Sequence, residues 1–144
     1  MTSTNVLKTL ADTTCDSVKG YKQCAEKAND PAIKQALQRR GQQREQTLSM
    51  LNAEIARQGG EPVTDGTISG GAHRIWTTIT SAFEDNDEAV AERVEEGEDY
   101  IAGKFQEALD NADLDPQSRQ VVQQCAAEIQ QGERFGDMLE QQHG

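Results

Sequence analysis

The chain is poor in aromatic residues and in positive charge. Aromatic residues make up 4% of its 144 residues, and 14 lysines and arginines stand against 25 aspartates and glutamates, for a formal net charge of −11. A protein that binds a polyanion needs clustered basic side chains to neutralise the phosphates. The composition therefore argues against nucleic acid and against anionic membrane surfaces as partners.

Long apolar runs are also missing. No run approaches the roughly 20 residues that cross a bilayer, and the N-terminal residues Met1 to Lys8 lack the basic-then-apolar order of a signal peptide. We therefore expect a soluble cytoplasmic protein that does not associate with membranes.

Cysteine motifs and the common catalytic motifs are absent as well. The three cysteines, Cys15, Cys24 and Cys125, are odd in number and show no C-x-x-C spacing, so they predict neither a zinc site nor a thiol-redox site. The sequence contains no Gly-rich phosphate loop, nucleophile elbow or dinucleotide fingerprint. These absences favour a protein that is not an enzyme.

What the sequence does contain is helical periodicity. Apolar residues recur at spacings of three and four, and glycine and proline fall between the periodic stretches, which indicates an all-α protein. The pairs Asp30-Pro31 and Asp115-Pro116 each combine an N-cap residue with proline at the first helical position. We expect helices over residues 4–28, 31–58, 71–84, 87–111 and 116–141.

The connections between these helices predict their topology. Each Asp-Pro turn joins two long helices closely and so forms an antiparallel hairpin, whereas the segment from Gly59 to Asn86 is too long for a tight turn. Residues 1–144 should therefore form a single ferritin-like four-helix bundle of two antiparallel hairpins joined by a long crossover. The short helix over 71–84 should lie across the bundle.

Four motifs carry a resemblance to a known family. They are Gly-Ala-His-Arg-Ile-Trp at 71–76, Gly-Gly-Glu-Pro at 59–62, Gly-Glu-Asp at 97–99 and Ala-Leu at 108–109. Together they resemble a bacterial ferritin-like family, domain of unknown function 2383, over nearly the whole chain. The resemblance implies a four-helix bundle and brings no established activity. Members carry His-Asp in the last helix where this chain has Gly132-Glu133, so the role of that histidine does not carry over.

A ferritin-like fold raises the question of a metal site. Di-iron proteins of this kind use one glutamate on each of two helices and Glu-x-x-His on each of the other two. No Glu-x-x-His pair lies within the predicted helices, and the nearest patterns are Glu95-x-x-Glu98 and Glu128-x-x-Gln131. Helix surfaces often carry such pairs by chance. We therefore favour no cofactor, with an iron or manganese site that uses Glu95, Glu98 and Glu128 as the alternative.

The residues at the helix seams predict a polar layer instead. Seam positions alternate spacings of three and four, and on the last helix they are Val121, Cys125, Glu128, Gly132, Phe135 and Leu139. The same reading places Glu98 and Arg44 at the middle of their helices, with Tyr21 or Ser17 at the same level. Our hypothesis is that a guanidinium paired with two carboxylates occupies the place of a metal site. In the alternative, Arg44 extends to solvent.

Glycines inside predicted helices need a physical reason, because each costs about 1 kcal/mol relative to alanine. Gly41, Gly97 and Gly132 are in this position. They predict close approach of helices or room for bulky neighbours, and a small-ligand pocket is the alternative.

The crossover motif contains the chain's only tryptophan, Trp76, beside His73 and Arg74. Trp76 is expected to anchor the crossover helix in the core. His73 is either a hydrogen-bonded structural residue or a ligand or general base, and Arg74 pairs with surface carboxylates or recognises an anion.

These observations favour a non-enzymatic structural or interaction module, with a role in stress physiology by analogy alone. The alternatives are a carboxylate-bridged di-metal protein that handles iron or peroxide, and a binder of a small ligand beneath the crossover helix. Oligomerisation is plausible because long exposed helix faces often pair, and a homodimer would have twofold symmetry by default; no protein partner is identified.

Overall fold

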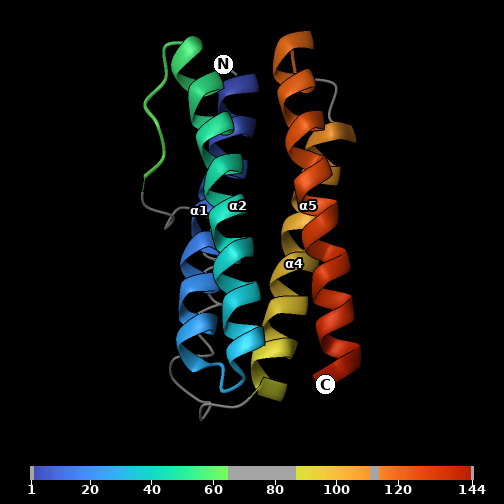
Figure 1. Ribbon diagram of the computed structural model, residues 1–144. Helices are drawn as coiled ribbons and strands as arrows, with labels where there is room; N and C mark the ends of the chain where they lie inside the picture. The colour runs from blue at the N-terminus through green and yellow to red at the C-terminus, as the bar shows by residue number, and fades with distance from the viewer. Residues whose placement is uncertain (1, 65–86, 111–113, 144) are drawn as a thin grey trace.

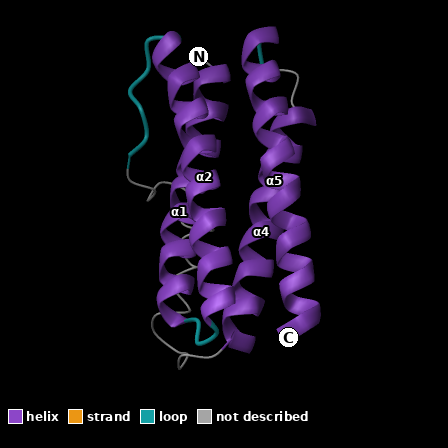
Figure 2. Cartoon of the chain, in the orientation of Figure 1, coloured by secondary structure: helices purple, strands orange, loops and turns teal. Residues whose placement is uncertain are grey.

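The structure, a computed structural model, describes residues 2–64, 87–110 and 114–143. It contains four helices, and no strand occurs within these ranges (Figure 2). The helices are α1 (Thr2–Lys27), α2 (Pro31–Arg57), α4 (Asp87–Asp110) and α5 (Pro116–His143). The short helix expected over 71–84 lies outside the described residues.

The turn between α1 and α2 has the capping chemistry that its sequence predicts. Asp30 adopts an extended conformation with φ −76° and ψ 122°, and its side chain accepts a hydrogen bond from the backbone N–H of Ala32 at 2.8 Å. Pro31 occupies the first turn, where no N–H is needed. At the start of α5, Asp115 Oδ1 likewise accepts from the backbone N–H of Ser118 at 2.9 Å.

Contacts between helix ends show how the two hairpins are joined. The Asp87 carboxylate at the start of α4 accepts from the backbone N–H of Asn29 at 2.7 Å, so α4 begins beside the α1–α2 turn. At the other end, the Gln58 amide that follows α2 donates to Ser118 Oγ near the start of α5. Helices α2 and α4 therefore run parallel, and the chain between them has to return over the length of the bundle.

The four helices pack in the order α1, α2, α5, α4 around the bundle, each against two neighbours (Figure 1). Their buried apolar residues form two clusters. One contains Leu7, Leu10, Leu51, Ile55, Ile101, Phe105, Val122 and Ile129. The other contains Tyr21, Cys24, Ile33, Leu37, Val90, Val94 and Leu139. Charged residues in the middle of the helices lie between the two clusters.

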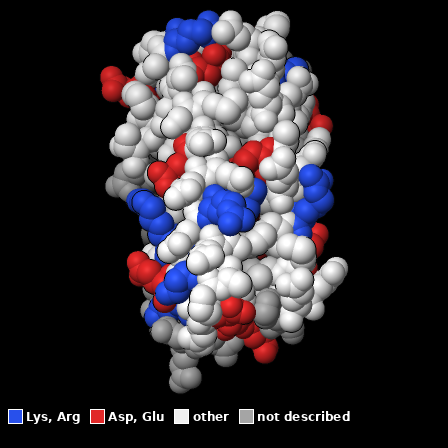
Figure 3. All heavy atoms as spheres, viewed as in Figure 1, with Lys and Arg blue, Asp and Glu red and all other residues white. Residues whose placement is uncertain are grey.

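The face formed by α2 and α5 carries basic and acidic side chains interspersed among uncharged ones (Figure 3). Single charges of mixed sign are typical of a solvated surface. None of the helices in the described part of the chain is long and apolar enough to cross a membrane.

Replacing Asp30 with alanine should lower the free energy of unfolding by about 1 kcal/mol, because α2 loses its capping acceptor. Chemical denaturation of both proteins measures the difference. Glu45→Ala, an exposed position within α2, is the control and should change stability by less than about 0.5 kcal/mol. Equal stabilities of the two variants would contradict the capping role.

Candidate functional site

The centre of the bundle is a salt bridge between Arg44 on α2 and Glu98 on α4. Arg44 Nη1 donates to Glu98 Oε1 and Arg44 Nη2 donates to Glu98 Oε2, each at 2.7 Å. Both side chains are 0% exposed. Two parallel bonds between a guanidinium and a carboxylate fix the orientation of both groups as well as their charge.

Glu128 on α5 is the second carboxylate of the centre, and its side chain is 16% exposed. It accepts from Arg44 Nε at 2.9 Å and from Arg44 Nη2 at 3.2 Å. Thr47 Oγ1 donates to it at 2.7 Å. A second arginine, Arg40, donates from Nη2 to the Glu128 carboxylate and, at 3.1 Å, to the Glu128 backbone carbonyl. Two cations thus face two anions.

Helix α1 completes the shell around the guanidinium. Ser17 Oγ accepts from Arg44 Nη1 at 2.6 Å, and Tyr21 Oη donates to Glu98 Oε2 at 2.8 Å. The Arg44 Cζ atom lies 5.6 Å from the centroid of the Tyr21 ring, within the range of a cation–π interaction. A guanidinium has five N–H donors, and the bonds to Ser17, Glu98 and Glu128 use all of them.

The surroundings of Arg44 keep it charged. Burial alone would lower the pKa of Arg44, but the charge and hydrogen bonds of Glu98, with smaller effects from Tyr21 and Glu128, raise it above its ordinary value. Burial and the negative charge of Glu98 raise the pKa of Tyr21 well above its usual range. The Tyr21 hydroxyl therefore keeps its proton and stays a donor.

Gly132 on α5 leaves the space that the ion pair fills. A Cβ atom at this position would lie 1.8 Å from Glu98 Oε2 and 2.4 Å from Arg44 Nη2. Any side chain there, including the histidine that the family resemblance implies for members, would displace the pair. Gly41 serves close helix approach instead, since a Cβ there would lie 3.3 Å from the Cβ of Tyr21 on α1.

The structure brings together all of the residues proposed for the central layer, namely Arg44, Glu98, Glu128, Tyr21 and Ser17. Arg44 does not extend to solvent. The sequence interpretation missed Arg40 and Thr47. Both lie on the same face of α2 as Arg44, four residues before it and three after it, and this spacing is the signal that identifies them.

The Glu98 carboxylate, considered as a metal ligand, is bonded to Arg44 and Tyr21. Glu95 is partly buried, and both Glu95 and Glu98 lie close to Gly136 on α5. Gln131 is exposed. The sequence interpretation overlooked one Glu-x-x-His, Glu140-x-x-His143 in the last turn of α5, whose histidine lies beyond the predicted helix end at residue 141. Among the described residues, no group of three or more histidine, cysteine or acidic side chains is placed to hold a metal ion.

The buried cysteines do not add reactive groups to the layer. Cys15, Cys24 and Cys125 are free and buried. Burial, reinforced by the charge of Glu128, raises the pKa of Cys125 to about 12, and burial also raises the pKa of Cys24. Thiols of this kind are inert because the thiolate is the reactive form. His73, Arg74 and Trp76 of the crossover motif lie outside the described residues.

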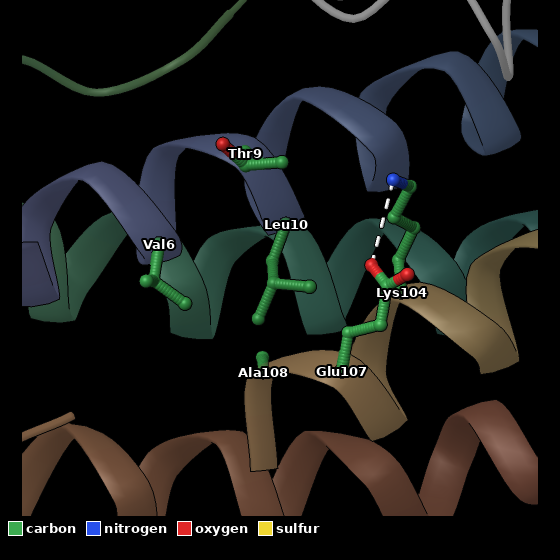
Figure 4. A pocket seen from close by; sticks show the side chains of 6 residues that line it. All are labelled: Val6, Thr9, Leu10, Lys104, Glu107 and Ala108. Atoms are coloured by element: carbon green, nitrogen blue, oxygen red, sulfur yellow. Dashed lines mark ion pairs between the residues drawn. The ribbon is translucent and has the colours of Figure 1, made fainter. Parts of the chain in front are cut away.

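Several shallow hollows lie between helices on the outside of the bundle. The one between α1 and α4 has a volume of about 160 Å³ and is lined by Val6, Leu10 and Ala108 (Figure 4). Lys104 and Glu107 stand at its edge and form a salt bridge of 3.5 Å. Ligand pockets usually exceed about 300 Å³, so this hollow is too small for most metabolites.

An acidic cluster occupies the outer face between α4 and α5, with Glu95 and Asp99 on α4 and Glu133, Asp137 and Glu140 on α5. Burial is the largest cause that raises the pKa of Glu133, followed by hydrogen bonding to Asp99 and by the charges of Asp99, Asp137 and Glu98. Burial and the charges of Glu140, Asp99 and Asp137 likewise raise the pKa of Glu95. The carboxylates of this cluster therefore repel one another at neutral pH.

The helices and the central layer define an all-α bundle whose middle contains an arginine–carboxylate network. The family profile described as Domain of unknown function (DUF2383) matches residues 2–111, and the chain belongs to this family. The matched range includes Arg44 and Glu98 and ends before α5, so Glu128 and Gly132 lie outside it. A comparison with curated proteins finds no match.

Gly132→Ala should lower the free energy of unfolding by about 2 kcal/mol or more, because the added methyl group displaces a buried ion pair. Gly103→Ala is the matched control. A Cβ at Gly103 meets no atom within 4 Å, so this variant should gain about 0.5–1 kcal/mol. Urea denaturation distinguishes the two, and a Gly132→Ala protein as stable as the original would contradict the packing described.

Glu133→Gln should raise stability at pH 7, by less than about 1 kcal/mol because the group is partly solvated. The folded protein holds the Glu133 proton more tightly than the unfolded chain, whose pKa is near the ordinary 4.5. The ionised carboxylate therefore costs stability as pH rises above that value. The gain should vanish near pH 3, where both states are protonated. Thermal denaturation at both pH values measures it.

Proposed function

We propose that the protein is a non-catalytic ferritin-like bundle that acts as a structural or interaction module. The observation that carries the proposal is the Arg44 guanidinium, which pairs with Glu98 and Glu128 at mid-bundle. Ferritin-like di-metal proteins place inward-facing carboxylates and their metal ions in this part of the bundle. Here an arginine supplies the positive charge in place of an ion.

The chemistry of the layer supports this replacement. Arg40 and Arg44 balance Glu98 and Glu128, so a divalent cation would add uncompensated positive charge to a buried site. The guanidinium N–H groups also use the carboxylate oxygens that a hard cation would need. Glu98 and Arg44 are sealed from solvent, which leaves no position where a substrate could meet them.

The direction of the helices supports the ferritin-like assignment. Parallel α2 and α4 require one long crossover between two hairpins, as in ferritin-like folds, whereas simple up-and-down bundles use short loops throughout. The crossover helix over 71–84, with Trp76 as its anchor, remains part of this proposal. A role in stress physiology rests only on analogy with other ferritin-like proteins.

Metal analysis tests the proposal directly. After anaerobic incubation with Fe²⁺ or Mn²⁺ and desalting, the protein should retain far less than one ion per chain, because Arg44 occupies the cation position. Near-stoichiometric metal that disappears in Glu98→Gln or Glu128→Gln would overturn the proposal.

Arg44→Met provides the complementary measurement. This variant leaves the buried Glu98 carboxylate without its cation, while Glu128 keeps Arg40, and the loss should cost about 3–5 kcal/mol of stability. Mn²⁺ should then raise its melting temperature more than that of the original protein, since an ion that binds the folded state stabilises it. Arg44→Lys keeps the charge and serves as the folded control that should not respond to Mn²⁺. Equal responses of all three proteins would argue against a cation position at Arg44.

A further inference from the structure

The outer groove between α4 and α5 differs from the other hollows of the bundle in its charge. It has a volume of about 340 Å³, and its charged lining residues are Asp99 and Glu133. The hollow between α1 and α4 instead carries Lys104 with Glu107, and the one between α1 and α2 carries Lys22 with Glu45. These two are electrically balanced, whereas the α4–α5 groove is lined by negative charge alone.

The floor of this groove is apolar, and several of the side chains that line it are small. Ala102, Gly103 and Phe105 line it from α4, and Ala126 and Ile129 line it from α5. The small side chains allow another helix to approach the backbone closely, and a Cβ at Gly103 would meet no atom within 4 Å. The lining runs from Asp99 to Leu109 on α4, which corresponds to roughly 15 Å of helix.

The acidic cluster extends the groove at the Asp99 end, with Glu95 on α4 and Asp137 and Glu140 on α5. Within the described part of the chain, no lysine or arginine forms a salt bridge with any member of the cluster. Burial is the largest cause that raises the pKa of Glu95 and of Glu133, and the charges of neighbouring carboxylates add to it. A cationic partner would relieve this repulsion.

We propose that the α4–α5 groove is a docking site for an amphipathic helix of a partner protein, with an apolar face and lysines or arginines toward one end. The apolar face would lie on Ala102, Gly103 and Ala126, and the basic end would meet Asp99 and Glu133. This inference rests on the proposed role as an interaction module and names the kind of partner. A second copy of this chain is disfavoured as the occupant of the groove, because each chain carries a net charge of −11 and two copies would repel each other.

A synthetic amphipathic peptide of about 14 residues, roughly 20 Å long as a helix, tests the proposal with the full chain. It carries leucine and alanine on one face and arginines at one end, and fluorescence anisotropy measures its affinity. We expect saturable binding that weakens at high salt. A peptide with glutamates in place of the arginines, and one with the same composition in scrambled order, should bind at least about tenfold more weakly.

Variants locate the binding site. Gly103→Leu fills the groove without changing its charge, and Asp99→Asn with Glu133→Gln removes the charge without filling it. Each variant should weaken peptide binding by about three- to tenfold. Gly103→Leu blocks the contact surface, and the charge variant removes the attraction between the rim and the arginines of the peptide. Glu26→Gln with Glu45→Gln removes the same number of exposed charges from α1 and α2 and should leave affinity unchanged. Circular dichroism confirms that each variant is folded.

Several results would overturn the proposal. Two of them concern the peptide: the absence of saturable binding, and equal binding by the groove variants and the control. The other two point to a different occupant. Displacement of the peptide by millimolar Ca²⁺ or Mg²⁺, with ion binding confined to the cluster, would indicate a metal ion, and a monomer–dimer equilibrium altered by Gly103→Leu would indicate a second copy of the chain. The proposed function is tested by metal that depends on Glu98 or Glu128, and none of these results bears on that dependence, so the two proposals can fail separately.

Discussion

The rest of the structure depends on the charge of Arg44 inside the bundle. A guanidinium removed from water is costly unless every donor finds an acceptor, and here three other helices supply those acceptors through Ser17, Glu98 and Glu128. A small shift of any helix along its axis would leave at least one of these bonds unmade. The layer therefore determines the helix register, which the apolar contacts on either side would allow to vary.

The same requirement explains features that look unrelated in the sequence. Gly132 is unsuited to the middle of a helix on propensity alone, yet only glycine leaves room for the Arg44–Glu98 pair. Tyr21 sits in an apolar cluster, yet its hydroxyl is directed to Glu98. Whether the ion pair adds net stability is a separate matter, because desolvation offsets much of the Coulomb gain.

Helical periodicity and capping signals were sufficient to predict the four described helices. The residues that meet at mid-bundle could also be predicted, because the midpoints of antiparallel helices of similar length lie at the same level of the bundle. The phase of the α5 seam was harder to predict. Its buried stripe contains Val122, Ile129 and Gly136, whereas the predicted stripe used Val121, Glu128 and Phe135. Both stripes share Cys125, Gly132 and Leu139, and alternating spacings of three and four do not distinguish them. Arg40 was missed because it lies outside the predicted seam of its helix, where an arginine side chain is usually exposed to solvent.

The division of charge between the two hairpins limits how they can associate. The α1–α2 hairpin contributes Arg40 and Arg44, and the α4–α5 hairpin contributes Glu98 and Glu128. Two α1–α2 hairpins placed face to face would bury arginines against arginines, and two α4–α5 hairpins would bury four carboxylates without a counterion. Each hairpin is thus complementary only to the other kind. During synthesis, the first hairpin leaves the ribosome with an exposed cationic centre that cannot pair with a neighbouring copy of itself and must wait for the second.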